Sequence, residues 1–457
     1  MDYKTLSQQY KRFTYKAYDY KIKDDEIELI FSYQLESDTE QIPFIHRVSY
    51  YVETSDIHLR RNQIQNYVNF IFHIGLIETI NYYKLACPQE VYIACGRLTE
   101  EQEKWWKKLF YHGLGEFIYL NKMVEEVNED NFVHFVSSMD QPLMNVTVDI
   151  QTKGHLIPIG GGKDSVVTLE ILKEDHDISL PFVMSAPKAA YDCIEVAHYH
   201  DYLEAQRYFD QRLIDMNEMG YLNGHVPFSA ILAFIATFGA VLAGKKHIPL
   251  SNERSANEPS VIGTTFNHQY SKSYEFEDDF ANYLQDYLTK DIEYFSLLRP
   301  LYEIEIGHLF SKYTNYHHVY RSCNQGKKEN KWCGKCAKCL FVYIILSPFI
   351  DLEQLEHDFG KELYSDMDLK DIFDELIGIK ETKPFECVGT IWEVRHALNL
   401  FIKKTHHPHH AYPPLVQYYI EIGGPKLADE PTDYEEGHRV PLHYLNRLRK
   451  ELDDIGE

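Results

Sequence analysis

The residues best placed to do chemistry begin with a glycine-rich loop. It follows an apolar run at 156–159 and leads into a helical pattern near 165–173. Without Cβ atoms the backbone can approach a ligand closely, and loop amides beside a helix N-terminus suit an oligophosphate. The spacing fits neither a Walker loop nor a dinucleotide fingerprint, and a turn without any ligand is the alternative. The loop consists of Gly160, Gly161, Gly162, Lys163, Asp164 and Ser165.

Four of the eight cysteines form a second cluster, within 17 residues. Four thiolates at short spacing fit a closed tetrahedral Zn²⁺ site, which staples the chain and does no chemistry. Lys335 and Lys338 lie between these cysteines and help to keep the thiolates ionised. An iron–sulfur cluster and unliganded thiols are the alternatives, and we expect zinc. The four cysteines are Cys323, Cys333, Cys336 and Cys339.

A run of polar residues at 251–257 follows an apolar stretch at 246–250 that is typical of a strand. Ligands bind at the carboxyl ends of parallel strands, so we expect this run to face a ligand. Glu253 suits a base or an Mg²⁺ ligand, and its alternative role is a salt bridge. Arg254 suits a bidentate grip on a carboxylate or phosphate. The run also contains Asn252, Ser255 and Asn257.

Two later runs supply further candidates. In residues 266–277, His268 suits a base near neutral pH, with a structural histidine as the alternative. Lys272 suits a phosphate or carboxylate contact, as opposed to a solvated lysine. In residues 383–390, Cys387 is a candidate thiol base, although a lone cysteine is more often a small buried apolar residue. The first of these runs also contains Asn267, Gln269 and Ser271.

The glycine loop resembles the Ser-Gly-Gly-x-Asp-Ser loop of the N-type ATP pyrophosphatases, with Gly160 in place of the first serine. That departure removes one hydroxyl donor, and Lys163 is expected to supply charge instead. The resemblance implies an enzyme that splits ATP between the α and β phosphates and transfers AMP to a carboxyl or carbonyl oxygen. Asp164 would then be a ligand for Mg²⁺.

The loop and the cysteines also resemble 7-cyano-7-deazaguanine synthase, over residues 150–345 only. That enzyme uses ATP to activate a carboxylate on the way to a nitrile. The resemblance leaves open an alternative function, namely another adenylating enzyme that makes an amide, nitrile or thiolated base. A nucleotide-binding regulatory protein without catalysis is the alternative from another class.

All five blocks in order, across about residues 150–400, resemble the bacterial UDP-N-acetyl-α-D-muramoyl-L-alanyl-L-glutamate epimerases. The resemblance implies inversion of the terminal L-Glu of UDP-MurNAc-L-Ala-L-Glu in peptidoglycan precursor biosynthesis, with ATP and Mg²⁺ consumed through a carboxyl-adenylate to AMP and diphosphate. It implies ATP binding by the glycine loop and substrate binding by Asn252, Arg254, Ser255, Asn257, Asn267, Gln269 and Ser271. It implies catalytic roles for Glu253, His268, Lys272 and Cys387.

The elements that must position these residues indicate an α/β fold. Apolar and polar residues alternate over the first 50 residues, which predicts antiparallel strands, and helices are expected near 64–84 and 100–120. From residue 149, short apolar runs alternate with helical stretches, which predicts a parallel sheet. We therefore expect three regions: 1–148 (α+β), 149–345 (a central pyrophosphatase-like domain with the cysteine site) and 346–457 (mainly helical).

Composition and charge narrow the function classes. A net charge of −24 opposes a broad nucleic-acid surface, because such surfaces rely on lysine and arginine. The uncharged stretch at 226–244 is expected to be a buried helix of an α/β domain and not a membrane span. The N-terminus lacks the layout of a signal peptide, so we expect a cytoplasmic protein. The expected partners are ATP and the nucleotide-linked dipeptide.

Overall fold

The computed structural model describes residues 1–51, 63–140, 143, 154–260, 266–405, 411–427 and 437–456. The region boundary predicted at 148 and 149 lies outside these ranges. A mixed α/β architecture, as predicted from the sequence, is confirmed.

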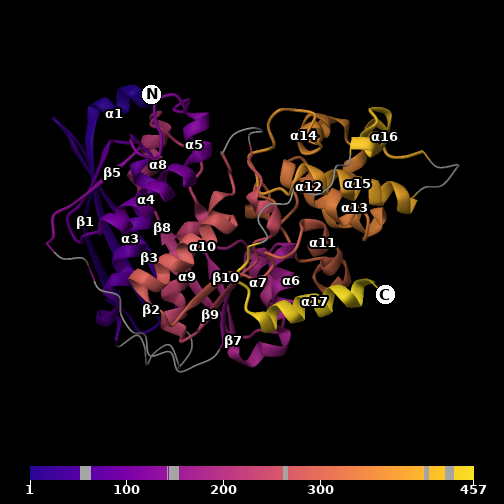
Figure 1. Ribbon diagram of the computed structural model, residues 1–457, viewed down its shortest axis with the longest axis horizontal. Coiled ribbons are helices and arrows are strands. Elements are labelled where there is room, and N and C mark those ends of the chain that lie inside the picture. The colour runs from indigo at the N-terminus through magenta and orange to yellow at the C-terminus, as the bar shows by residue number, and fades with distance from the viewer. Residues whose placement is uncertain are drawn as a thin grey trace.

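The described strands form one ten-stranded sheet (Figure 1), in the order β10-β9-β6-β7-β8-β3-β2-β1-β4-β5. Neighbouring strands from β10 to β8 pair in parallel, whereas β3 pairs antiparallel with both β8 and β2. The sheet therefore runs without a break from the N-terminal strands into the central ones. The strands are β1 (Tyr10–Ile22), β2 (Glu26–Ser37), β3 (Gln41–Tyr51), β4 (Glu90–Ile93), β5 (His134–Ser137), β6 (His155–Pro158), β7 (Ser179–Met184), β8 (Leu203–Tyr208), β9 (His247–Leu250) and β10 (Glu293–Ser296).

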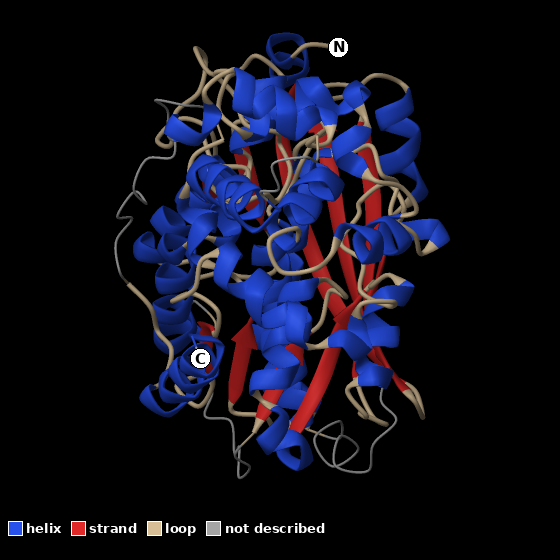
Figure 2. Cartoon of the chain, turned by 90° about the vertical axis from the view of Figure 1, so that its right-hand side faces the viewer, coloured by secondary structure: helices blue, strands red, loops and turns tan. Residues whose placement is uncertain are grey.

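Helices pack against this sheet, and Figure 2, a quarter turn away, shows many of them in front of its strands. The two helices predicted near 64–84 and 100–120 are present, the second as a pair interrupted at Leu114. The helices are α1 (Tyr3–Gln9), α3 (Val68–Tyr83), α4 (Glu100–Gly113), α5 (Gly115–Leu120), α6 (Lys163–Ile171), α7 (Lys188–Val196), α8 (Gln211–Glu218), α9 (Phe228–Ala243), α10 (Tyr274–Tyr283), α11 (Glu303–Lys312), α12 (Ala337–Leu346), α13 (Leu352–Phe359), α14 (Lys370–Leu376), α15 (Ile391–Thr405), α16 (Pro414–Glu421) and α17 (Leu442–Gly456).

Two cores form because side chains of a strand alternate between its faces. In β6 and β7, Leu156 and Phe182 point into the core that α3 and α9 cover. Their neighbours Ile157 and Val183 point into the other core, with α6, α11 and α12. The buried helix predicted over 226–244 is α9. The described part of the chain contains no helix with the length and apolar character needed to cross a membrane.

Beyond β10 every described element is helical, as expected for the C-terminal region. Helices α12 to α16 gather at the right of Figure 1, at the opposite end from β1. The last helix, α17, turns back to pack on α6 and α11, so the C-terminal segment helps to hold the central layer.

Candidate functional site

The candidate site lies where the parallel strands end. The chain runs from β6 to β7 and β8 on one side and then returns to place β9 on the other side of β6. In open α/β sheets, ligands bind in the crevice at such a change of direction. The glycine loop follows β6 at this point, and the polar run at 251–257 follows β9. Strand order thus brings together two motifs that are about ninety residues apart.

The glycine loop is shaped for a close backbone approach. Gly161 has a φ of +84°, and a Cβ there would lie 2.6 Å from the backbone nitrogen of Ala190. Gly160 is open, because its nearest neighbour for an added Cβ is the Ser165 hydroxyl at 3.8 Å. The Gly160 amide donates to that hydroxyl at 3.0 Å, which ties the loop to the first turn of α6. The loop amides and the start of α6 therefore border one space.

That space is a cavity of about 290 Å³ with cations on its walls. Beside the loop, the Arg321 amide donates to the Gly161 carbonyl at 2.7 Å. The Arg321 Nε and the Ser322 hydroxyl are buried without a hydrogen-bond partner among the described residues. Lys272 and Lys338 also line the cavity. Unpaired buried donors beside a glycine loop fit an anionic group with several acceptor oxygens.

Acidic side chains form a compact group beside the loop. Carboxylate oxygens of Asp164, Glu253 and Glu303 all lie within 4.8 Å of one another. Lys163, itself buried, contacts both Asp164 and Glu303. Burial and the neighbouring carboxylates raise the pKa of Glu303 to about 8, although Lys163 opposes the shift. Three oxygen ligands in one place fit a divalent cation of the Mg²⁺ type.

A thiol with cationic neighbours occupies another wall of the same cavity. Burial raises the pKa of the Cys387 thiol, but Lys272 and His268 more than offset this and lower it to about 6. The imidazole of His268 is a close neighbour of the thiol and also contacts Glu116. Burial lowers the pKa of His268, and these two partners raise it to about 9. At neutral pH the pair is therefore a thiolate beside an imidazolium.

A buried arginine fixes the backbone of this wall. Arg299 donates to the Glu277 carboxylate at 3.1 and 3.0 Å. It also donates to the backbone carbonyls of Glu253 and Lys272. Its side chain is almost wholly buried, so the two loops that carry Glu253 and Lys272 share one rigid anchor. A fork of this kind uses the planar guanidinium in a way that lysine cannot.

Of the seven predicted substrate residues, Asn252 lines the cavity, and the other six are not among the residues that line it. Asn252 donates to the Ser296 hydroxyl at 3.0 Å. The Arg254 guanidinium lies over the Tyr302 ring, 5.0 Å from its centroid. Ser255 donates to the buried Glu393 carboxylate at 2.6 Å. Asn257 ends the short 3₁₀ helix η3 (Arg254–Asn257), Ser271 lies in the 3₁₀ helix η4 (Tyr270–Lys272), and Asn267 and Gln269 lie in the turn before η4.

A smaller apolar cavity of about 160 Å³ adjoins the glycine loop. Phe182 and Met184 at the end of β7 line it, with Phe228 and Leu232 of α9. Gly160 borders both cavities. A flat apolar group attached to a phosphate chain could therefore occupy the two spaces together.

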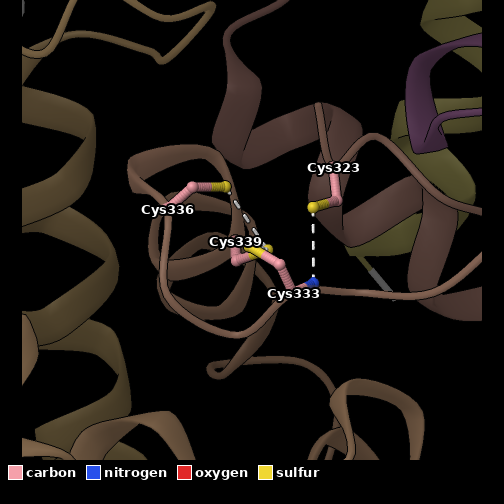
Figure 3. Close-up of side chains that lie close together, drawn as sticks. All are labelled: Cys323, Cys333, Cys336 and Cys339. Carbon is pink, nitrogen blue, oxygen red and sulfur yellow. Dashed lines mark hydrogen bonds between the residues drawn. The ribbon is translucent and has the colours of Figure 1, made fainter. Parts of the chain in front are cut away.

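The four clustered cysteines come together at the start of α12 (Figure 3). Their sulfur atoms lie within 4.8 Å of one another, with Cys336 Sγ 3.5 Å and Cys333 Sγ 3.6 Å from Cys339 Sγ. The Cys323 sulfur accepts hydrogen bonds from the amides of Gly326 and Cys333. This donor set can hold a metal such as zinc. The cysteine cluster also borders the cavity, because Lys338, which lies between Cys336 and Cys339, lines the cavity and contacts the Cys387 carbonyl.

Comparisons with known proteins show the family of the chain. The family model of the MurL N-terminal domain matches residues 4–297, and that of the MurL C-terminal domain matches residues 319–422. The chain belongs to the MurL family. A relative from Xanthomonas oryzae pv. oryzae, named UDP-N-acetyl-alpha-D-muramoyl-L-alanyl-L-glutamate epimerase, is 32% identical over 82% of this chain and 84% of its own. A relative of the same name from Salinispora tropica is 32% identical over 85% and 84%.

No solved structure matches the chain. The MurL N-terminal match extends from the first strands through the glycine loop to β10, and so includes both halves of the sheet. The C-terminal match includes the cysteine cluster and Cys387. The candidate cavity is built from both matched segments.

Several residues of the site were not predicted from the sequence. Arg299 and Glu303 follow β10 and could have been found by applying the strand-end rule to that strand too. Arg321 lies two residues before the first cysteine of the cluster, and the metal-ligand spacing of the cysteines does not indicate a role for it. Glu116 carried no local signal, because it reaches His268 only through tertiary packing.

Proposed function

We propose that this chain inverts the terminal L-Glu of UDP-MurNAc-L-Ala-L-Glu in peptidoglycan precursor biosynthesis, using ATP. The observation that carries the proposal is that one cavity has the glycine loop on one wall and the Cys387 thiol, beside Lys272, on another. An activating group and a base then act on the same carboxylate and its neighbouring carbon. The relatives named as epimerases for this substrate support the choice of reaction.

ATP is assigned to the two adjoining cavities. The phosphate chain would accept hydrogen bonds from the loop amides, Arg321 and Ser322, whose buried donors lack other partners among the described residues. The adenine would enter the apolar cavity beside Phe182 and Leu232. Gly160 lies between the two, where a side chain would block the path.

The acidic group fits Mg²⁺, with Asp164, Glu253 and Glu303 as the proposed ligands. A bound divalent cation would neutralise phosphate charge and so favour attack at the α-phosphate. Lys163 balances the acidic charge of this group by contacting Asp164 and Glu303. The cysteine cluster is proposed to hold a structural zinc, which orders the cavity wall through Lys338 and takes no part in the reaction.

Adenylation explains why an epimerase would consume ATP. Removing a proton next to a free carboxylate is very hard, because the enolate would carry a second negative charge beside the first. Transfer of AMP to the carboxylate removes that first charge and makes the α-proton far more acidic. Water then releases AMP after the proton has been returned to the opposite face.

Cys387 is proposed to take the α-proton with His268 as its partner, and a donor on the opposite face returns a proton that comes from solvent. At neutral pH the Cys387 thiolate can take the α-proton, and the His268 imidazolium keeps the anion available. Lys272, whose pKa is raised although burial opposes its charge, lies on the same wall and would stabilise the enolate oxygen. The substrate contacts predicted for Arg254, Ser255, Asn257, Asn267, Gln269 and Ser271 stay predictions.

Product analysis in heavy water tests this function. The chain is incubated with ATP, Mg²⁺ and UDP-MurNAc-L-Ala-L-Glu, without any amine or sulfur donor. We expect D-Glu that carries solvent deuterium at the α-carbon, together with AMP and pyrophosphate. An adenylating enzyme of the amide- or nitrile-forming kind would leave the glutamate L and undeuterated, and that result would overturn the proposal.

A further inference from the structure

Helix α5 brings an acidic residue of the N-terminal region to the candidate site. Glu116 Oε2 is in direct contact with Nδ1 of His268, and both side chains are only 11% exposed. The ring of His225 lies 4.2 Å from the His268 ring, between centroids, and covers it from the loop before α9. The His225 Nδ1 is 3.7 Å from the same carboxylate oxygen. Glu116 is therefore held against His268 in a small enclosed space.

The same helix contacts both segments that carry the proton-moving pair. The Tyr119 ring lies 6.2 Å from the Phe266 ring and 5.7 Å from the Phe385 ring, between centroids. Phe266 is two residues from His268, and Phe385 is two residues from Cys387. Helix α5 thus contacts two loops that are more than a hundred residues apart in the sequence. Its packing fixes their relative position, and its carboxylate fixes the imidazole.

The charges around the pair show which group Glu116 serves. Burial, and then His268, lower the pKa of His225 to about 3, so His225 is neutral and leaves the carboxylate to His268. Cys387 faces Lys272 from η4, Lys338 from α12 and His268. Its neighbour Glu386 adds an acidic group on the side of Lys338. Two lysines favour the thiolate directly, whereas Glu116 acts on it only through the imidazolium.

We propose that Glu116 is a positioning residue that orients His268 and holds it as an imidazolium against Cys387, so the N-terminal region completes the catalytic apparatus. This inference rests on the proposed function, in which Cys387 takes the α-proton. A buried acid that fixes the orientation and charge of a catalytic histidine is a recurrent arrangement in nucleophile–histidine pairs. The role differs from that of a ligand contact, because Glu116 itself does not line the cavity.

The matched experiment compares Glu116→Gln with Glu129→Gln. Glu129 accepts from His112 at 3.0 Å, so it forms an equivalent carboxylate–histidine pair in the same region but on the exposed surface. For E116Q we expect deuterium exchange at the α-carbon to fall about 10²-fold, because the base is misplaced and less ionised. ATP–pyrophosphate exchange, which reports adenylation alone, should stay at the wild-type rate. E129Q should leave both rates unchanged.

A second readout separates positioning from simple loss of structure. The rate of Cys387 carbamidomethylation by iodoacetamide is followed against pH by peptide mass spectrometry. In the wild type we expect an inflection near 6. Without the Glu116 charge the imidazolium is less stable, so the inflection should move to higher pH in E116Q. In Glu116→Asp, which restores the charge, it should return toward the wild-type value.

The outcomes are distinguishable. Wild-type exchange rates and an unmoved inflection in E116Q would overturn the role of Glu116 while leaving the proposed function intact. Loss of both exchange reactions together would show that Glu116 supports the fold of the site and does not act on the thiol alone, which also overturns the inference. Absence of deuterium exchange in the wild type would instead contradict the proposed function.

Discussion

At the scale of single residues, the cavity reverses the charge of the molecule around it. The protein carries a net charge of −24, yet cationic side chains line the walls of the cavity. Such focusing draws an anionic ligand to a site that the average charge would repel. The cavity-lining cations are Lys272, Arg321, Lys327, Lys331 and Lys338.

Gly161→Ala tests the glycine loop. A Cβ at Gly161 would meet the backbone of Ala189 and Ala190 at 2.7 and 2.6 Å, at a φ that disfavours alanine. We expect ATP–pyrophosphate exchange to fall below detection and the protein to lose stability. Gly360→Ala is the control, because Gly360 has a φ of +78° with nothing within 4 Å of an added Cβ. Its variant should lose about 1 kcal/mol by denaturant titration and keep full exchange activity.

The pH profile of deuterium exchange tests the proton-moving pair. Exchange should rise with pH through about 6, as Cys387 becomes the thiolate. It should fall again above about 9, as His268 loses the proton that stabilises this anion. A value of kcat/KM for deuterium exchange that does not change with pH near 6 or near 9 would contradict the assignment. A Cys387→Ala variant with normal exchange would contradict it too.

Residue types at strand ends could be recognised in the sequence, and contacts between distant segments could not. The glycine loop, Lys272 and Cys387 were predicted and do share one cavity. The relation of Cys387 to His268 has no local signal, because 118 residues separate them along the chain. Their meeting depends on packing that no spacing rule describes.

At the scale of elements, Arg299, which follows β10, joins the segments that carry Glu253 and Lys272. Arg299→Lys keeps the positive charge but loses the fork that joins Glu277 to the two loop carbonyls. We expect about 1.5 to 3 kcal/mol of lost stability and a lower rate of deuterium exchange. The measurements are denaturant titration and the exchange assay.

Arg207→Lys is the matched control for that variant. Arg207 makes a largely buried fork to Glu78, at 2.7 and 2.8 Å, away from the cavity. Its variant should lose a similar stability and keep the wild-type exchange rate. If both variants lose exchange equally, Arg299 has no special role at the site.

The cysteine cluster at the start of α12 gives a second prediction at the scale of elements. We expect about one equivalent of zinc in the wild type, and Cys336→Ser should lose it and have a lower midpoint of thermal unfolding, since the proposed metal would join four separate positions of the chain. Cys95→Ser, at a half-buried cysteine outside the cluster, should keep its metal. Metal analysis by mass spectrometry decides this, and iron with charge-transfer absorbance in the wild type would replace zinc by an iron–sulfur cluster.

At the scale of the whole molecule, the site is a product of all parts of the chain. Pairing of β3 with β8 makes one sheet of the N-terminal and central strands. Alternation predicted the strands themselves, such as the buried Ile27, Leu29 and Phe31 of β2. It could not predict that pairing, because either neighbour would satisfy the same apolar face.

This architecture makes the N-terminal region part of the catalytic unit. The continuous sheet fixes α3 and α9 against each other, and α5 reaches from the same region to His268. The C-terminal segments supply Cys387 and the cysteine cluster to the cavity. The proposed active site thus depends on the folding of the whole chain.

The most direct test of the central claim is the dependence of α-proton exchange on cleavage of ATP. Deuterium uptake into the terminal glutamate is measured with ATP, with α,β-methylene-ATP and without nucleotide. The proposed chemistry predicts uptake with ATP alone, because only a cleavable α–β bond can mask the carboxylate. Equal uptake with the methylene analogue or with no nucleotide would contradict it.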